Sequence, residues 1–249
     1  MAVLAAIEAT AAHHFYVVTY TCGAVNGLVL LAISIVLSVV VIAAGVAIFV
    51  MTPTHQTLLL ARQKAIAALC AKRGLVSEVG SGDFAIVGPI DPHWFANAHA
   101  TPDHTVAVAD FTQLAGQQPT LFSILTFTVA GVNIPFIAVG RKGLTSITVG
   151  GPQMFELEST DFDNRFTVKA KDRRSATMLL DPGMMQLLLD CDQVNFDMVG
   201  DRVLAYVNRA AEPAHQPTEP VEFELLFRFL DGFVARMPAI LRSDYAVEQ

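Results

Sequence analysis

Hydrophobic and polar positions divide the chain into one long apolar run and a following region of mixed periodicity. Residues 25–51, VNGLVLLAISIVLSVVVIAAGVAIFVM, contain no charged side chain. A helix of about 20 apolar residues is long enough to cross the ~30 Å hydrocarbon layer of a bilayer. The run therefore predicts a transmembrane helix over 25–51, preceded by an extracytoplasmic segment over 1–24.

The charges on either side of this run predict its orientation. Residues 1–24 contain no Lys or Arg and one acid, Glu8, which also argues against a cleaved signal peptide. The other flank carries four basic residues: Arg62, Lys64, Lys72 and Arg73. Because positive charge marks the cytoplasmic side of a span, we expect a single-pass protein with its N-terminus outside and residues 52–249 in the cytoplasm.

A second helix is predicted after Pro53, in a juxtamembrane region over 52–74 that Gly74 ends. Its apolar positions recur at steps of three and four residues: Leu58, Leu59, Ile66, Leu69 and Cys70. Two interpretations stay open. The helix packs on its own domain, or its basic face binds the membrane surface. Packing is favoured, because four basic residues over twelve positions are few for lipid recognition.

Residues 75–249 are predicted to form one cytoplasmic domain. Residues 80–103 are rich in Gly, Pro, Asp and His, which indicates a loop with one short strand at 84–87. Strands are expected at 105–111, 120–130 and 136–140, then a hairpin of VNFDM and RVLAYV, and a C-terminal helix that ends near Pro238. The fold class is therefore α+β: one N-terminal transmembrane helix, then a mostly antiparallel sheet with two helical regions and a C-terminal helix.

The stretch 155–190 holds a dense group of acidic and basic residues. Alternating residues in FELES and FTVKA predict an antiparallel strand pair with Glu156 near Lys169. Asp172 and Asp181 each stand where a helix N-cap is expected, and Pro182 follows the second. These charges are thus expected to cap helices, to pair across strands or to face solvent.

A calcium loop is excluded in the same stretch. Asp161, Asp163, Asn164 and Asp172 have part of the EF-hand spacing. Phe166, however, stands at the sixth position, where the sharp turn of the loop needs Gly.

Three histidines, His93, His99 and His104, form the weakest candidate, a metal or hydrolytic site with nearby acids Asp91, Asp103 and Asp110. Their spacings of six and five match no standard zinc pattern. The sequence also has no phosphate-binding loop, dinucleotide fingerprint or GxSxG motif. We therefore assign no catalytic, cofactor-binding or metal-binding residue and expect no cofactor.

Composition narrows the classes of partner. Hydrophobic residues make up 53% of the chain, and its three cysteines, Cys22, Cys70 and Cys191, show no CxxC spacing. Residues 52–249 hold 16 positive against 22 negative charges, a net charge of −6. Nucleic acid is not expected as a partner, because its binding needs clustered Lys and Arg.

Residues 155–208 contain the run F-E-L-E-S-x-x-F-x-x-R-F-x-V and then A-x-x-L-L-x-P-x-M-M-x-x-L-L. This pattern resembles a bacterial family of membrane-anchored proteins of unknown function. The resemblance implies a transmembrane anchor in the bacterial plasma membrane and a cytoplasmic α+β domain. It implies no active site.

These patterns together predict a non-enzymatic accessory or scaffold subunit that binds a protein partner, or a second copy of itself, at the cytoplasmic face of the membrane. The alternative is a membrane-tethered module that binds a lipid or another small ligand. The 16 phenylalanines supply material for the lining of such a pocket, and equally for a core.

Overall fold

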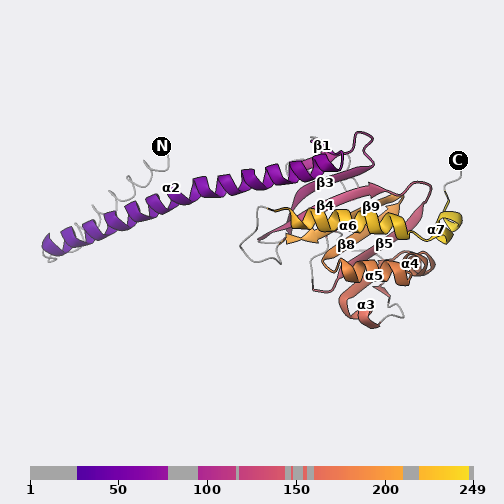
Figure 1. The fold of residues 1–249 in the computed structure, drawn as a ribbon. Coiled ribbons are helices and arrows are strands. Elements are labelled where there is room, and N and C mark those ends of the chain that lie inside the picture. Colours follow the sequence, from indigo (N-terminus) through magenta and orange to yellow (C-terminus); the bar gives the residue numbers. More distant parts are fainter. Residues whose placement is uncertain are drawn as a thin grey trace. The chain divides into compact units, whose positions relative to one another are not determined.

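The structure of the 249-residue chain is a computed structural model. It describes residues 27–77, 95–115, 118–143, 147, 154–155, 160–209 and 219–246. The chain divides into two compact units, Met1–Thr57 and Leu58–Gln249 (Figure 1). The second unit contains the sheet and most of the helices.

A single long helix, α2 (Gly27–Lys72), is the first described element and has 46 residues. Pro53 lies inside it, so the predicted helix end near Pro53 is wrong. A proline removes one backbone donor, and the hydrogen bonds on either side keep the helix continuous. The predicted stop at Gly74 is confirmed, because Gly74 has φ +76°, a left-handed conformation that favours glycine.

The predicted membrane topology needs correction. Among the residues whose surroundings the structure describes, no helix offers an apolar stretch of the length needed to cross a membrane. From Gly27 onward, the apolar run is the first part of a longer helix, which continues into charged sequence. The transmembrane helix, the single-pass topology, the plasma-membrane localisation and the membrane-anchored form of the α+β fold class are therefore wrong.

The described strands form one nine-stranded sheet in which every pairing is antiparallel. The order across the sheet is β1-β2-β3-β4-β9-β8-β5-β7-β6. The strands are β1 (Val76–Ser77), β2 (Phe95–Ala100), β3 (Val106–Ala115), β4 (Gln118–Thr128), β5 (Ile134–Arg141), β6 (Met154–Phe155), β7 (Phe166–Ala170), β8 (Val194–Gly200) and β9 (Arg202–Asn208).

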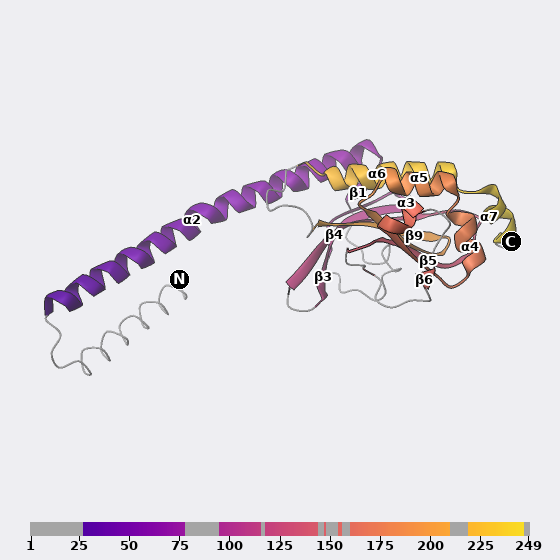
Figure 2. The same ribbon diagram turned by 90° about the horizontal axis from the view of Figure 1, so that it is seen from below.

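Five shorter helices follow α2 in the described sequence. They are α3 (Thr160–Arg165), α4 (Arg173–Leu179), α5 (Pro182–Asp190), α6 (Val221–Arg236) and α7 (Ala239–Asp244). Helices α5 and α6 lie side by side on one face of the sheet (Figures 1 and 2). The predicted C-terminal helix is present as α6, and it ends before Pro238 as expected.

Side chains of the sheet alternate between two faces, and each face has its own apolar cluster. The larger cluster joins Val108, Leu125 and Phe196 of the sheet to Phe229 of α6 and Ile66 of α2. The smaller cluster lies on the opposite face, with its described members drawn from β2, β3, β4 and β9 and from Ile147. The sheet therefore presents one face to the helices, and that face receives the polar groups discussed below.

Several local predictions from the sequence are confirmed. The strand expected at 105–111 is part of β3, and VNFDM and RVLAYV form the β8–β9 hairpin around Gly200, which has φ +65°. Strand β2 was missed, because its sequence FANAHA has no β-branched residue and lies in a region predicted as a loop. The strand expected at 84–87 falls outside the described residues.

The charge-rich stretch folds largely as predicted. Asp172 caps α4 by accepting hydrogen bonds from the N–H groups of Arg174 and Ser175, and Asp181 caps α5 by accepting one from Met184 at 2.8 Å. Strands β6 and β7 pair antiparallel, but the predicted register is wrong. Met154 lies opposite Lys169 where Glu156 was expected.

Asp172 also accepts a hydrogen bond of 2.6 Å from the hydroxyl of Tyr245, which follows α7. This hydroxyl, followed by the backbone N–H of Ser175, lowers the pKa of the Asp172 carboxyl below its usual value. One carboxylate thus caps α4 and connects it to the end of α7.

We expect Asp172→Ala to lower the free energy of unfolding by about 1 kcal/mol, the typical loss for an N-cap. Because the pKa is lowered on folding, the charged carboxylate stabilises the protein above its unfolded pKa of about 3.9 and ceases to do so as the pH falls through its lower folded value. Thermal melts between pH 7 and pH 3 measure this dependence. Tyr245→Phe should reduce it, and an unchanged pH profile in Tyr245→Phe would contradict the assignment.

Gly232 lies inside α6, where glycine is unfavourable by up to about 1 kcal/mol relative to alanine. A Cβ atom built at Gly232 would stand 2.5 Å from Cδ1 of Leu187 on α5. Leu187 is buried, with 4% of its surface exposed, so its side chain has little room to move. Gly232 therefore permits the close approach of α5 and α6.

Gly232→Ala should lower the free energy of unfolding by about 1 kcal/mol, because overpacking of 1–3 kcal/mol exceeds the gain in helix propensity. In the Leu187→Ala background the same change should be neutral or stabilising. Chemical denaturation of the two single variants and the double variant gives the coupling energy. Additive effects would show that the two residues do not compete for space.

Candidate functional site

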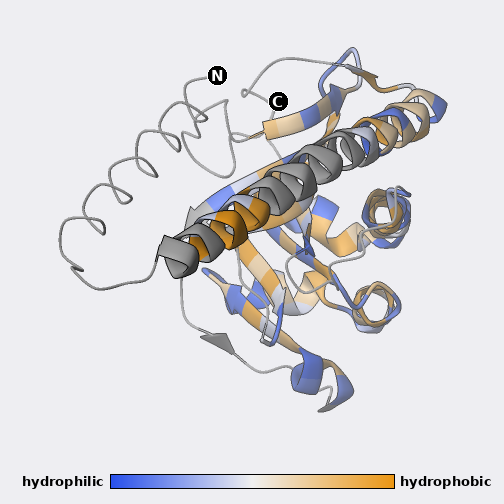
Figure 3. Ribbon diagram, turned by 90° about the vertical axis from the view of Figure 1, so that its left-hand side faces the viewer, coloured by the Kyte–Doolittle hydropathy of each residue, from blue (hydrophilic) through white to orange (hydrophobic). Residues whose placement is uncertain are grey.

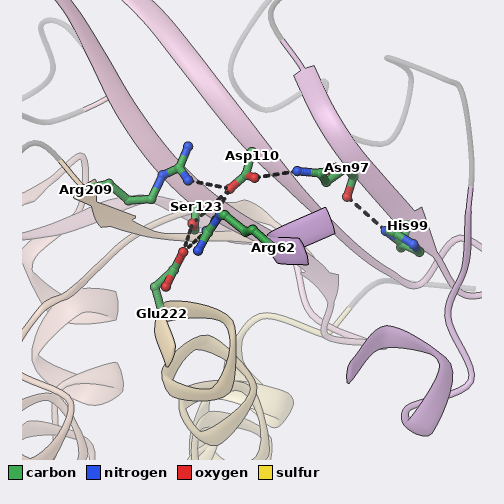
Figure 4. A network of polar contacts seen from close by, with 7 residues as sticks. All are labelled: Arg62, Asn97, His99, Asp110, Ser123, Arg209 and Glu222. Atoms are coloured by element: carbon green, nitrogen blue, oxygen red, sulfur yellow. Dashed lines mark hydrogen bonds and ion pairs between the residues drawn. The ribbon is translucent and has the colours of Figure 1, made fainter. Parts of the chain in front are cut away.

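A network of polar side chains lies between the helices and the sheet (Figure 4). Its members come from five parts of the chain: Arg62 on α2, Asp110 on β3, Ser123 on β4, Arg209 after β9, and Glu222 in the first turn of α6. Asp110 and Ser123 are directly opposed in the β3–β4 register, so they project from the same face of the sheet. We call these five residues the polar network.

Asp110 is the centre of the network. Its Oδ1 atom lies 3.3 Å from Nη1 of Arg209 and 3.5 Å from Nη2 of Arg62, and its Oδ2 accepts a 2.8 Å hydrogen bond from Asn97. Arg62 also forms an ion pair with Glu222. The hydroxyl of Ser123 lies 3.2 Å from Asp110 and 3.3 Å from Glu222, so it bridges the two carboxylates.

Asn97 reaches Asp110 because β2 is irregular at this point. The β2–β3 register shifts between Ala96 and His99, and Asn97 has φ 55°, a left-handed conformation that Asn adopts more readily than most residues. The Nδ1 atom of His99 lies 2.9 Å from the carbonyl oxygen of Asn97. The bulge therefore directs an amide donor toward the centre of the network.

The charges of the network balance and are shielded from solvent. Arg62 is 8% exposed, Asp110 6%, Ser123 0% and Glu222 5%, and the side chain of Arg209 is 10% exposed. Two guanidinium groups face two carboxylates, so no net charge is buried. Breaking a buried pair of this kind by removing one partner is costly, because it leaves a desolvated charge.

This arrangement favours a structural role over catalysis. A carboxylate that acts as a general base or binds a metal ion must be accessible to its substrate or ion. Both carboxylates of the network instead contact guanidinium groups, and their residues are nearly closed to water. A substrate would have to displace an arginine to reach either of them.

An ion pair at the surface provides a contrast to the polar network. Arg73 pairs with Asp231 of α6 at 2.9 Å and lies over the ring of Phe227, with 5.0 Å between its Cζ atom and the ring centroid. The side chains of Arg73 and Asp231 are 41% and 58% exposed. Exposed pairs of this kind contribute about 0–1 kcal/mol, so they are suitable controls for the buried network.

The structure describes four of the six residues of the predicted histidine site. His93 and Asp91 lie outside the described residues, His99 is buried in β2, and His104 lies in the turn before β3 with φ 56°. In the part of the chain that the structure describes, no group of three His, Cys, Asp or Glu side chains could hold a metal ion. Of the six residues, Asp110 belongs to the polar network.

Asp103 has a local role in the turn that contains His104. Its Oδ1 atom accepts hydrogen bonds from the hydroxyl and the backbone N–H of Thr105, at 2.9 and 3.3 Å. Hydrogen bonds from the side chains of Thr101 and Thr105 lower the pKa of the Asp103 carboxyl. This carboxylate organises the β2–β3 connection.

The two described cysteines are core residues. Cys70 and Cys191 are both fully buried, with 0% of their surface exposed. Burial raises the pKa of the Cys70 thiol to about 11, and it also raises the pKa of Cys191. A thiol that is protonated and buried is a poor nucleophile, so neither residue is a candidate for catalysis.

Comparisons with known proteins give little further guidance. No family model matches the sequence, and no curated protein is similar to it. A solved structure with a related arrangement is the crystal structure of the mycobacterial trehalose monomycolate transport factor A, TtfA. The two chains are 11% identical, with a TM-score of 0.45 over 76% of this chain and 98% of that one. This likeness is too low to carry an argument about function, and the resemblance of residues 155–208 to a bacterial family stays a prediction.

Sequence reasoning missed most of the polar network. Arg62 was placed in a basic helix, Asp110 was named as a nearby acid in the weakest candidate site, and Glu222 was given no role. The partners are separated by 48 residues between Arg62 and Asp110 and by 160 residues between Arg62 and Glu222. One available signal was the charge of Asp110 within an otherwise apolar strand, TVAVADF.

We expect Asp110→Asn to lower the free energy of unfolding by roughly 3–5 kcal/mol, because the guanidinium groups of Arg62 and Arg209 would both lose a buried carboxylate. Asp231→Asn is the matched control at the exposed pair with Arg73, and its effect should stay below about 1 kcal/mol. Urea denaturation of both variants measures the difference. Similar losses in the two variants would contradict the structural role of the network.

Proposed function

We propose that this protein is a non-enzymatic accessory subunit, and that it binds a protein partner through an exposed apolar segment of α2. The segment comprises residues 33–41, ISIVLSVVV. Its large apolar side chains are all exposed, by between 46% for Val41 and 62% for Val36. The same stretch is coloured as hydrophobic in Figure 3.

This exposed surface is the observation that carries the proposal. Nine residues make about two and a half turns of helix, so apolar side chains point in every direction around the axis. A helix that is apolar all round is normally buried. Its own polar side chains do not change this character, because the hydroxyl of Ser38 donates to the carbonyl oxygen of Ser34 within the helix. A partner that supplies an apolar groove or a bundle of helices would cover it.

The absence of enzymatic activity is supported by the polar network. Its carboxylates are paired and shielded, and the described cysteines are protonated core residues. The groups that are best placed for chemistry therefore already have structural roles. What the described surface offers instead is apolar contact area.

The proposal predicts stoichiometric cross-linking to a partner protein from positions inside the apolar segment. A photo-reactive side chain at Val36 or Val40 of the full chain should give one dominant protein adduct in the native source. Val36→Asp combined with Val40→Asp should abolish the recovery of that protein. Leu60→Asp is the matched control, since Leu60 lies on the same helix outside the segment and is 57% exposed.

Two results would overturn the proposal. One is recovery of the chain without a stoichiometric partner. The other is equal protection of the segment by protein-free lipid vesicles and by the native source, because the cover would then not be a protein.

A further inference from the structure

Residues 58–72 are the end of α2 that lies in the second unit, and we call these residues the docked segment. Apolar side chains anchor the docked segment to the domain core. Among the side chains of residues 60–72, whose burial the structure describes, Ile66 and Cys70 are apolar and fully buried, and Leu69 is partly buried against the same cluster. Arg62 is the buried charged residue of these, and Lys64 and Lys72 are exposed.

Arg62 is imperfectly satisfied where it is buried. Its Nη2 atom contacts Asp110 and Glu222, whereas its Nε atom has no hydrogen-bond partner among the described residues. A buried donor without a partner carries a desolvation penalty that no hydrogen bond offsets. The docked state thus retains part of the cost of removing a guanidinium group from water.

We infer that the docked segment binds reversibly to the sheet. The charge of Arg62 makes the position of the bound segment specific, and it lowers the stability of the bound state. Buried ion pairs often stabilise a protein no more than apolar residues of similar volume would, because desolvation offsets their attraction. Release of the segment returns Arg62 and Glu222 to water and regains that hydration. The segment is therefore able to open while the rest of the domain stays folded. This inference does not depend on the proposed function.

The remaining residues of the network explain why opening can be local. Without Arg62, Asp110 keeps its ion pair with Arg209 and its hydrogen bonds from Asn97 and Ser123. Glu222 lies in the first turn of α6, where the helix dipole favours a negative charge. Once water enters, neither carboxylate is left both buried and unpaired.

The contacts at the end of α2 do not prevent this motion. The ion pair of Arg73 with Asp231 is solvent-exposed, and such pairs are individually small. The half-exposed Arg73 also lies over the ring of the buried Phe227, a single contact that contributes little at an exposed cation. Among the side chains of residues 60–72, the main resistance to opening is the burial of Ile66 and Cys70. The free energy of opening is thus expected to be smaller than that of global unfolding.

Hydrogen exchange of the full chain, followed by mass spectrometry, tests the inference. In the wild-type protein, amides of the docked segment should exchange at least about tenfold faster than those of the β8–β9 hairpin. Equal exchange in the two regions would mean that the segment opens only when the whole domain unfolds, which would overturn the proposal.

Two variants then separate the role of charge from that of packing. Arg62→Met leaves Glu222 buried without its partner and should accelerate exchange of the docked segment by at least about tenfold. The double variant Arg62→Met with Glu222→Leu removes both charges and keeps the Asp110–Arg209 pair. It should slow exchange of the docked segment below the wild-type rate by a similar factor.

Lys64→Met is the matched control, because it makes the same change at an exposed position of the same segment. It should leave the exchange rates unchanged. A double variant that exchanges as fast as the wild-type protein, or faster, would show that the ion pair is a net stabiliser and would overturn the inference. The variant Arg62→Leu with Glu222→Met exchanges the two side-chain sizes and serves if the first double variant does not fold.

Discussion

Burial of charge is the constraint on which the second unit depends. Asp110 projects from β3 on the face whose apolar cluster includes Val108 and Leu125, and such a buried carboxylate is tolerated only with partners. Its charged partners come from both ends of the sequence, from Arg62 before the described strands and from Arg209 after them, and Glu222 of α6 pairs in turn with Arg62. The network therefore requires α2, the β3–β4 pair and α6 to meet at one place. Apolar packing alone would permit several arrangements of these elements.

Features that depend on near neighbours could be predicted from the sequence. Asp172 and Asp181 cap helices through N–H groups two or three residues away, and the β8–β9 hairpin needs only a glycine turn between two alternating strands. Contacts between distant residues could not be predicted. The register that placed Glu156 beside Lys169 was wrong by two positions, since alternation defines which face a residue occupies and does not define its opposite partner.

The transmembrane prediction failed for a related reason. A run of apolar residues shows that a helix needs surroundings other than water, and it does not identify those surroundings. The first part of α2 illustrates this, because residues 33–41 are apolar and exposed in the chain taken alone. The helix that contains this run continues past Pro53 and carries Arg62. The length and hydropathy of the run therefore describe only part of the helix.

The two parts of α2 use opposite means of association. Residues 33–41 offer apolar area without any directional group, which gives affinity but little selection of position. The docked segment has few apolar anchors and one charged group that must meet Asp110 and Glu222, which selects a position but adds little affinity. The partner binding proposed above would benefit from this division, because the apolar, unselective surface is separated from the specific one. Catalysis at the polar network would remove the contacts that define the position of the docked segment, since a substrate would have to replace Arg62.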